Sequence, residues 1–249
     1  DTVLSRGLGD VYKRQILMKF DAEKSQIVES LQNAAAVAER RQTIPILANV
    51  RLKTLNGKLE VTATDLEIQI KTYSELINIE AEGETTVSAR KMSELCRSLP
   101  DGEKVNFSLT SGKLTVRANN FHADFATISP DDVPEIEINE ELNPLKINSS
   151  ILKRVLTKTS FSMASQDVRY YLNGMLLEVQ GSKINGVATD GHRLALSSSS
   201  SVDSSLEVRN ILPRKAVLEL SKLLSADDKD INLMIGPSYI CLLYTSPSP

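Results

Sequence analysis

Tryptophan is absent from this sequence, and aromatic residues of all kinds make up only 4% of it. A chain of this composition has to build its cores from aliphatic side chains. Long apolar runs are absent as well, and none approaches the length that a membrane span requires. The 249 residues carry 29 basic and 32 acidic side chains. The length suits one large domain or two small ones.

The two ends of the chain lack the features of functional segments. Residues 1–15 have neither the apolar core nor the small-residue cleavage site of a signal peptide. DNA that encodes Asp10–Gln15 can be read as its reverse complement to give Cys241–Ser246, so both ends resemble one sequencing-library adapter in opposite orientations. A flexible Ser/Pro linker is the alternative for the C-terminal end, but it does not explain this match. We expect residues 1–17 to be an adapter-derived leader and residues 241–249 an adapter-derived tail.

Cysteine is scarce, with two residues in the whole sequence. If Cys241 belongs to an adapter, Cys96 stands alone in a natural segment that begins near Met18 and runs to about Ile240. No disulfide can then form, which fits a reducing compartment. We therefore expect a cytoplasmic protein.

An internal repeat is the most informative feature of the chain. The segment "NGKLEVTATDLE" (56–67) aligns with "GSKINGVATDGH" (181–192) at an offset of 125 residues. Further along, "SARKMSELCRSL" (88–99) aligns with "LPRKAVLELSKL" (212–223) at an offset of 124. The acidic segment 137–145 would join the copies. The sequence thus predicts two copies of one structural unit.

Each copy shows the same order of secondary-structure patterns. A short strand (18–20; 145–147) precedes an amphipathic helix (22–41; 149–162), for which Ser149 or Ser150 is a plausible N-cap in the second copy. Alternating strands follow, and Asn56-Gly57 is a hairpin signal between two of them. A second helix (88–99; 213–225) and further strands complete the copy. We predict an α+β fold in which two helices per domain pack on antiparallel sheets.

Positive charge is concentrated on the four predicted helices. These ranges hold twelve basic and five acidic residues, although the chain as a whole is acidic. Mixed charges on helices usually form a solvated face, but three of these four helices are strongly basic. If they share a surface, that surface would attract a polyanion through its phosphates, without reading sequence and with sensitivity to salt.

Three long motifs resemble one protein family: "MASQDVRYYLNGM" (163–175), "VATDGHRLAL" (187–196) and "LPRKAVLEL" (212–220). They are similar to the bacterial DNA sliding clamp, the β subunit of DNA polymerase III, as are "TIPILANV" (43–50) and "TATDLE" (62–67). The resemblance implies repeated DNA-clamp domains and a ring of two head-to-tail subunits, each with three domains. It implies that 18–140 is clamp domain 1 and 144–240 a C-terminally truncated domain 2. A third domain would be absent, so this chain by itself would be unable to close a ring.

The resemblance also implies contacts with double-stranded DNA that are independent of sequence. Arg41 and Gln166 match two DNA-contacting positions of the family, and Tyr170 and Tyr171 lie beside Gln166. An alternative is that the two tyrosines are strand residues with one ring buried. Weaker candidates for general phosphate attraction are Arg90, Lys91, Lys153, Arg154, Arg214 and Lys215.

A second set of residues matches one wall of the pocket in which the family binds short peptides of its partners. The set comprises Leu172, Thr189, Gly191, His192, Arg193 and Leu194. The implied partners are the polymerase III α subunit, the clamp loader, other proteins with a clamp-binding motif, and a second clamp subunit. We expect no cofactor, and we expect no metal because a metal site would need more ligands than His122 and His192 can supply. The dimer contacts within 117–128 stay unassigned, because Phe121 and Phe125 alternate differently from the family.

Two other functions compete with a clamp. Asp190 and His192 would share one face of a strand, which suggests a hydrolase, but the sequence contains no G-x-S-x-G nucleophile motif. The repeat also has Glu67 in place of His192. We therefore expect a non-catalytic protein. The remaining alternative is an open module that binds nucleic acid or peptide without encircling anything.

Overall fold

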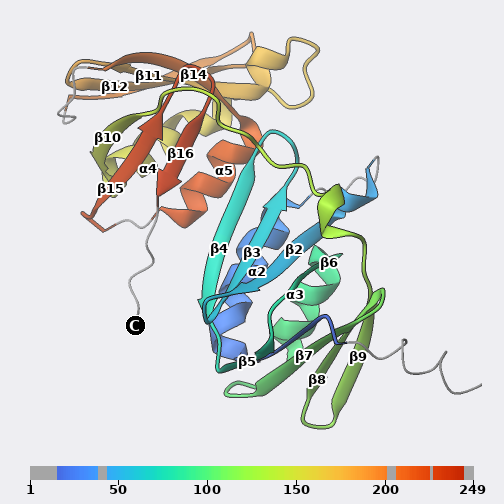
Figure 1. Cartoon of the computed structure of the whole chain (residues 1–249). Coiled ribbons are helices and arrows are strands. Elements are labelled where there is room, and N and C mark those ends of the chain that lie inside the picture. Colours follow the sequence, from blue (N-terminus) through green and yellow to red (C-terminus); the bar gives the residue numbers. More distant parts are fainter. Residues whose placement is uncertain (1–15, 39–43, 201–205, 225–226, 244–249) are drawn as a thin grey trace, which may run out of the picture. The chain divides into compact units, whose positions relative to one another are not determined.

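The computed structural model describes residues 16–38, 44–200, 206–224 and 227–243. The chain divides into two compact units, residues 1–136 and residues 137–249 (Figure 1). Each unit contains two α-helices and two antiparallel sheets among the residues described. The predicted α+β class, with paired helices on antiparallel sheets, is confirmed.

The described part of the first unit contains thirteen elements in chain order. They are β1 (Met18–Glu23), α2 (Lys24–Val37), η2 (Pro45–Ala48), β2 (Asn49–Leu55), β3 (Lys58–Thr64), β4 (Gln69–Glu75), β5 (Asn78–Ala81), β6 (Glu84–Ser88), α3 (Ala89–Ser98), β7 (Lys104–Thr110), β8 (Lys113–Ala118), β9 (Phe121–Ala126) and the 3-10 turn η3 (Pro130–Asp132), and the strand β10 then opens the second unit. One sheet has the strand order β5-β1-β7-β8-β9 and the other β4-β3-β2-β6. The expected hairpin turn lies between β2 and β3, where Asn56 (φ 51°) and Gly57 (φ 81°) both adopt positive φ.

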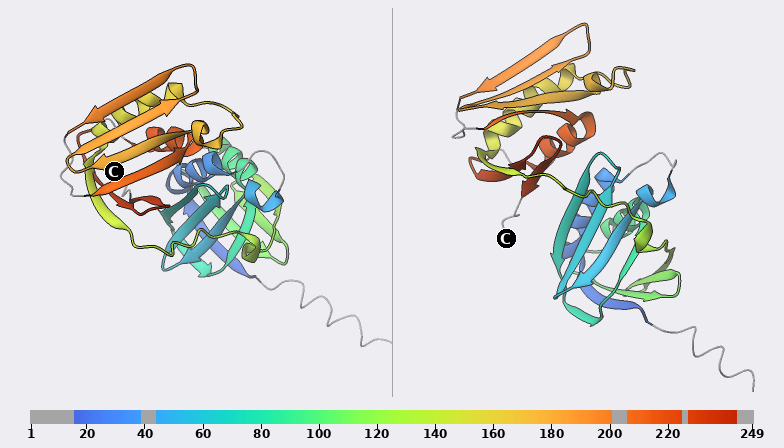
Figure 2. Two further views of the ribbon diagram at one scale, coloured as in Figure 1. Left: turned by 90° about the horizontal axis from the view of Figure 1, so that it is seen from above. Right: turned by 45° about the horizontal axis from the view of Figure 1, so that its top comes forward.

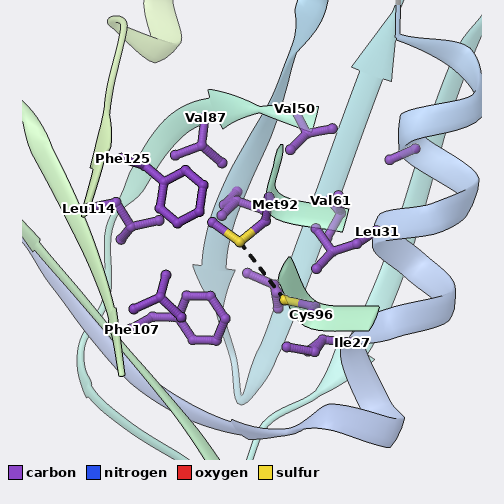
Figure 3. Close-up of a cluster of buried hydrophobic side chains, with 14 of the residues drawn as sticks. Ile27, Leu31, Val50, Val61, Val87, Met92, Cys96, Phe107, Leu114 and Phe125 are labelled. Carbon is purple, nitrogen blue, oxygen red and sulfur yellow. Dashed lines mark hydrogen bonds between the residues drawn. The ribbon is translucent and has the colours of Figure 1, made fainter. Parts of the chain in front are cut away.

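The core of the first unit is mainly aliphatic, as the composition requires (Figure 3). Two of its aromatic rings, those of Phe20 and Phe107 on the paired strands β1 and β7, stack with centroids 4.6 Å apart. Cys96 lies fully buried on α3 with its sulfur 3.9 Å from that of Met92, and burial raises the pKa of the Cys96 thiol to about 12. This thiol is therefore protonated and unreactive at neutral pH.

The second unit follows the same general order, with two strands fewer among the residues described. Its elements are β10 (Asn143–Asn148), α4 (Ser149–Thr159), η4 (Ser160–Ser162), η5 (Tyr170–Asn173), β11 (Gly174–Gln180), β12 (Lys183–Thr189), β13 (Leu194–Ser199), β14 (Glu207–Pro213), α5 (Arg214–Leu223), β15 (Asp230–Ile235) and β16 (Ile240–Leu243). The strand orders are β13-β12-β11-β14 and β10-β15-β16. Residues 241–243, which the nucleotide reading assigns to an adapter, pair with β15 as the greater part of β16.

The strand registers of the two units show how the repeat aligns. Asn49 pairs with Ser88 and Gly174 with Pro213, so both partners lie 125 residues further along in the second unit. The same offset relates the starts of α3 and α5, at Ala89 and Arg214. The sequence alignment that placed 88–99 on 212–223 at an offset of 124 was therefore wrong by one residue. The sequence alignment matched the Arg-Lys pair that both segments contain. In the structure, the equivalent residues are those at the same positions in the hydrogen-bonded strand pairs.

The two helices of each unit lie side by side on the inner face of its four-stranded sheet (Figure 2). In the first unit α2 packs on β3 and β4, while α3 packs on β2 and β6. In the second unit α4 packs on β12 and β13, and α5 on β11 and β14. Among the described residues, no helix has both the length and the apolar character needed to cross a membrane.

The helix starts differ in detail from the sequence prediction. The first helix begins at Lys24 because residues 22 and 23 extend β1, and Glu23 forms a capping box with Gln26. The N-cap of α4 is Asn148, whose side chain accepts a hydrogen bond from the Ser150 backbone N–H at 2.9 Å. The prediction of Ser149 or Ser150 as N-cap was therefore wrong, because β10 continues through Asn148 and the helix starts directly after it.

Candidate nucleic-acid and peptide interfaces

The first residue of α5 forms hydrogen bonds to the start of the segment 163–173 in the second unit. Arg214 donates from one guanidinium nitrogen to the carbonyls of Met163 (3.0 Å) and Ala164 (3.5 Å). The Ala164 N–H in turn donates to the Leu172 carbonyl at 2.9 Å, and the Leu172 side chain is buried. Arg214, predicted as a phosphate contact, therefore has a place in holding this loop.

The middle of the loop is fixed by Asp167, Arg169 and Asn173. Arg169 donates to both carboxylate oxygens of Asp167, at 3.0 and 2.9 Å. Asn173 accepts from the Asp167 N–H and donates to the Asp167 carbonyl, both at 2.8 Å. The hydrogen bonds from Arg169 lower the pKa of the Asp167 carboxyl to about 2. A double hydrogen bond of this kind fixes orientation as well as distance.

The three predicted DNA contacts of this loop project from it. Gln166 is exposed and adopts a φ of 62°, which is uncommon for a residue other than glycine. Tyr170 and Tyr171 lie in η5, with 82% and 49% of their surface exposed and their rings edge to face. The alternative in which they are strand residues with one buried ring is wrong. The turn leaves both rings at the surface, where a base or a sugar-phosphate backbone can reach them.

Thr189–Arg193 forms the turn between β12 and β13. Asp190 accepts the backbone N–H groups of His192 and Arg193, each at 3.0 Å, and its second oxygen accepts from the Arg193 side chain at 2.9 Å. The two backbone N–H groups lower the pKa of Asp190. Gly191, at a φ of 90°, allows the chain to reverse. The expectation that Asp190 and His192 share one face of a strand was wrong, because Asp190 organises a turn.

The first unit uses the same device after its own Ala-Thr-Asp segment. Asp65 accepts the backbone N–H groups of Glu67 and Ile68 at 3.1 and 2.9 Å, and Thr64 donates to the Ile68 carbonyl. Leu66 takes the place of Gly191 with a φ of 79°. The matching "ATD" residues of the repeat are therefore explained by hairpin geometry, and a catalytic pair is not needed to account for them.

The loop and the turn of the second unit lie against each other. A Cβ atom added at Gly191 would stand 3.3 Å from a guanidinium nitrogen of Arg169. On the other side, the Arg193 guanidinium lies 5.6 Å from the centre of the Phe161 ring, within reach of a cation–π contact. His192, Arg193 and Leu194 are exposed, Leu194 to 65%. Two separately predicted groups, Gln166–Tyr171 and Thr189–Leu194, are thus brought together on one unit.

The remaining cations of α4 and α5 differ in their surroundings. Lys153 donates to the Leu224 carbonyl at 2.7 Å and so satisfies the C-cap of α5. Arg154 is exposed and donates to the Ser199 hydroxyl at 3.3 Å. Lys215 is half-buried at the start of α5. Of these three, Arg154 is the best placed to meet a phosphate.

In the first unit, Lys24 plays the part that Lys153 plays in the second. It donates to the Leu99 carbonyl at the C-cap of α3 and to Asp101. Arg90 and Lys91 are exposed, and Arg90 forms an ion pair with Glu94 at 2.8 Å. Arg41 lies outside the described residues.

Sequence reasoning missed the residues that position others. The pairing of Asp167 with Arg169 could have been predicted, because the two residues have opposite charges and lie two apart in the loop that carries the candidate contact Gln166. Arg214 also carried a signal, because a cation in the first turn of a helix opposes the helix dipole and so has to find a partner elsewhere. No local pattern indicates that Lys24 and Lys153 bond to carbonyls more than 70 residues away.

Two family models match the chain in order. The model for the N-terminal domain of the DNA polymerase III beta subunit matches residues 18–137, and the model for its central domain matches residues 146–245. The two ranges fall on the two compact units.

Curated relatives and solved structures agree with these matches. Proteins named "Beta sliding clamp" from Pseudomonas aeruginosa and Escherichia coli K12 are 40% and 37% identical, each over 90% of this chain and 61% of the relative. A crystal structure of a sliding clamp from Pseudomonas aeruginosa bound to griselimycin superimposes with a TM-score of 0.84 at 40% identity, over 90% of this chain and 61% of the other. A Caulobacter crescentus clamp gives 0.83 at 30% identity, over 90% and 61%. The chain thus spans about three fifths of its relatives' length, and it belongs to the DNA polymerase III beta subunit family, whose N-terminal and central domains it matches.

Proposed function

We propose that the chain is part of a DNA sliding clamp, a processivity factor that encircles duplex DNA and tethers the replicative polymerase to it. The observation that carries the proposal is that both units match, in order, domains of the same subunit. Residues 18–140 and 144–240 act as the first two clamp domains. The remainder of a longer protein supplies a third, and two such subunits close head to tail into a ring.

DNA is held by general phosphate attraction, which permits sliding. The four helices as described carry ten basic and three acidic residues, and α4 carries three cations and no acid. Gln166, Tyr170 and Tyr171 add contacts from a loop that is held by its own hydrogen bonds. Because retention on DNA comes from the closed ring, the individual contacts can stay weak.

Partner proteins bind at the turn Thr189–Leu194 through an extended peptide with apolar side chains. The exposed Leu194 and the cation Arg193 beside Phe161 suit such a ligand. The partners are the polymerase III α subunit, the clamp loader and other proteins with a clamp-binding motif. The protein acts in the cytoplasm and is not an enzyme, and the use of both Asp190 oxygens within the turn supports this assignment.

The DNA surface is tested with the chain and two fluorescent duplexes of unrelated sequence. We expect equal affinity for both duplexes and a steep fall in affinity as salt rises from about 50 to about 200 mM. In Arg154→Gln, which removes an exposed helix cation, the slope of log K against log salt decreases by about 1.

Lys146→Gln is the matched control. It removes one exposed cation from the same unit, but from strand β10, where Lys146 pairs with Asp230 at 2.8 Å. The slope should stay unchanged in this variant. Equal effects of the two substitutions, or a clear preference for one duplex sequence, would contradict the proposed surface.

A further inference from the structure

The five-stranded sheet of the first unit has an unpaired edge at β5, and a hollow lies beside it. β5 is the terminal strand of this sheet, and among the residues described only its side toward β1 is paired with another strand (Figure 1). The hollow has a volume of about 380 Å³ and is lined by residues 76–80 together with Gly57 and Glu82. The backbone groups along an unpaired strand edge can form hydrogen bonds with another extended chain.

Hydrogen bonds fix the two ends of this hollow. At one end the Leu76 N–H donates to the Gly57 carbonyl at 3.1 Å, and at the other the Asn56 N–H donates to a carboxylate oxygen of Glu82 at 3.0 Å. The residue after Glu82 donates its N–H to the Thr54 hydroxyl at 2.9 Å, and its carbonyl accepts the Thr54 N–H at 3.0 Å. The walls are therefore held in place without a ligand, which lowers the entropic cost of binding one.

The lining of the hollow combines apolar side chains with negative charge. Ile77 is 51% exposed, and Leu76 and Ile79 are half-buried. The charged residues of the lining are Glu80 and Glu82, and both are exposed. Carboxylates repel the phosphates of a nucleic acid and attract cations. The ligand that this lining favours is therefore a protein segment with basic and apolar side chains.

Each of the two carboxylates keeps one oxygen for a ligand. Lys19 on β1 pairs with Oε2 of Glu80 at 2.6 Å, and the Asn56 N–H uses Oε1 of Glu82. In the described part of the chain, the second oxygen of neither glutamate has a hydrogen-bond partner. An ionised carboxylate accepts hydrogen bonds on both oxygens, so the two glutamates can receive an ammonium or guanidinium group from outside.

We propose that this hollow is a docking site for an extended segment of a partner protein that carries a lysine or arginine next to apolar residues. The segment lies along the free edge of β5, where main-chain hydrogen bonds supply affinity and alternate side chains supply selectivity. Its cation pairs with Glu80 and Glu82, and its apolar side chain covers Ile77. The site goes beyond the proposed function, because it requires neither DNA nor a closed ring.

The proposal is tested by NMR titration of the isotope-labelled 249-residue chain with a short synthetic peptide of alternating lysine and valine. One control peptide has glutamate in place of lysine, and another has every backbone nitrogen methylated. We expect the amide signals of residues 76–82 to shift with a Kd of about 1 mM or tighter for the lysine peptide. Neither control peptide should shift them, because one has the wrong charge and the other cannot pair with a strand. No DNA is present, so a failure of DNA binding does not affect the readout.

A matched pair of variants tests the role of the carboxylates. Glu80→Gln should weaken binding of the lysine peptide about threefold, the size expected for an exposed ion pair. Glu75→Gln is the control, because Glu75 is an exposed glutamate on β4 that also pairs with a lysine, Lys58 at 2.8 Å, but does not line the hollow. It should change the affinity by less than about 1.5-fold.

Three results would overturn the proposal. The first is the absence of shifts at residues 76–82 when the lysine peptide is added. The second is equal binding of the lysine and glutamate peptides, or equal effects of the two substitutions. The third is a shift of the same signals with the concentration of the chain alone, because a second copy would then be the occupant.

Discussion

At the scale of single residues, the hairpin turn after each Ala-Thr-Asp segment shows how one geometry accommodates two sequences. The position needs a positive φ, which Gly191 adopts without a side chain and Leu66 adopts with one. Positive φ costs an ordinary residue roughly 1–2 kcal/mol. Gly191 has a second constraint, because any Cβ there meets Arg169.

Gly191→Ala should lower the free energy of unfolding of the second unit by about 1–2 kcal/mol, as measured by urea denaturation. It should also shift the NMR signal of the Arg169 side-chain N–H, because the added methyl group displaces the guanidinium from Asp167. Gly181→Ala is the control: it places a methyl group at positive φ (54°) in open space. It should cost about 1 kcal/mol and leave the Arg169 signal unchanged. Identical spectra for the two variants would contradict the contact between loop and turn.

The pair between Asp167 and Arg169 predicts a pH dependence for the loop. The pKa of Asp167 is lowered from 3.8 to about 2, so the pair contributes stability that is fully present above pH 3.8 and is lost as the pH falls through about 2. NMR titration of the Asp167 carboxyl should therefore show a midpoint near 2, with the loop signals changing in parallel. A midpoint near 3.8 would show that the pair does not form in solution.

Residue-scale prediction from sequence succeeded where one residue decides a local geometry. The Asn56-Gly57 turn is an example, because few other pairs adopt positive φ twice. It failed for Asp190 and His192. Two residues that are two apart share a face on a strand but not in a turn, and the sequence did not distinguish the two conformations here. The exposure of Tyr170 and Tyr171 could not be predicted from the sequence either, because it depends on their lying in the 3-10 turn η5 and not in a strand.

At the scale of secondary-structure elements, a lysine of the first helix in each unit forms a hydrogen bond to a carbonyl at the C-terminal end of the second helix. Lys24 reaches the C-cap of α3, and Lys153 reaches the C-cap of α5. The two lysines do not occupy equivalent positions in their helices, but the carbonyls they satisfy, those of Leu99 and Leu224, lie 125 residues apart. The last carbonyls of a helix have no partner within it, so each contact stabilises the packing of two elements.

Lys153→Met should lower the free energy of unfolding by about 1.5 kcal/mol, because it removes a charged hydrogen bond to a backbone carbonyl. Lys158→Met, on the exposed side of the same helix, should change stability by less than about 0.5 kcal/mol. Thermal unfolding in low salt compares the two. If both variants were equally stable, the hydrogen bond from Lys153 would not contribute to stability, and Lys153 would again be a candidate phosphate contact.

Element-scale prediction worked because hydrophobic periodicity and the repeat supported each other. The four helices and the order of strands follow from patterns that occur twice. The one-residue error in aligning 88–99 had a physical cause, since a charged pair is a weaker marker of register than a hydrogen-bonded ladder. The cap at Asn148 could have been found from its Asn-Ser-Ser sequence, since Asn is as good an N-cap as Ser.

At the scale of the whole molecule, the chain combines basic helices with otherwise acidic surroundings in two repeated units. Charge of this kind indicates what class of partner is attracted, and the proposed closed ring would determine how that partner is held. The repeat made two units predictable. That the segment 128–136 crosses the four-stranded sheet of the first unit was not predictable, because it depends on contacts between residues far apart in sequence, such as Arg51 and Glu135.

The central claim is topological, so the most direct measurement compares DNA with and without ends. The full-length protein would be loaded onto a nicked circular plasmid, and the DNA-bound fraction would be measured by gel filtration before and after linearisation with a single-cutting nuclease. A sliding clamp should stay with the circle and be lost from the linear molecule, even at a salt concentration that abolishes simple phosphate binding. Equal retention or equal loss on the two forms would contradict the account and favour an open module that binds DNA without encircling it.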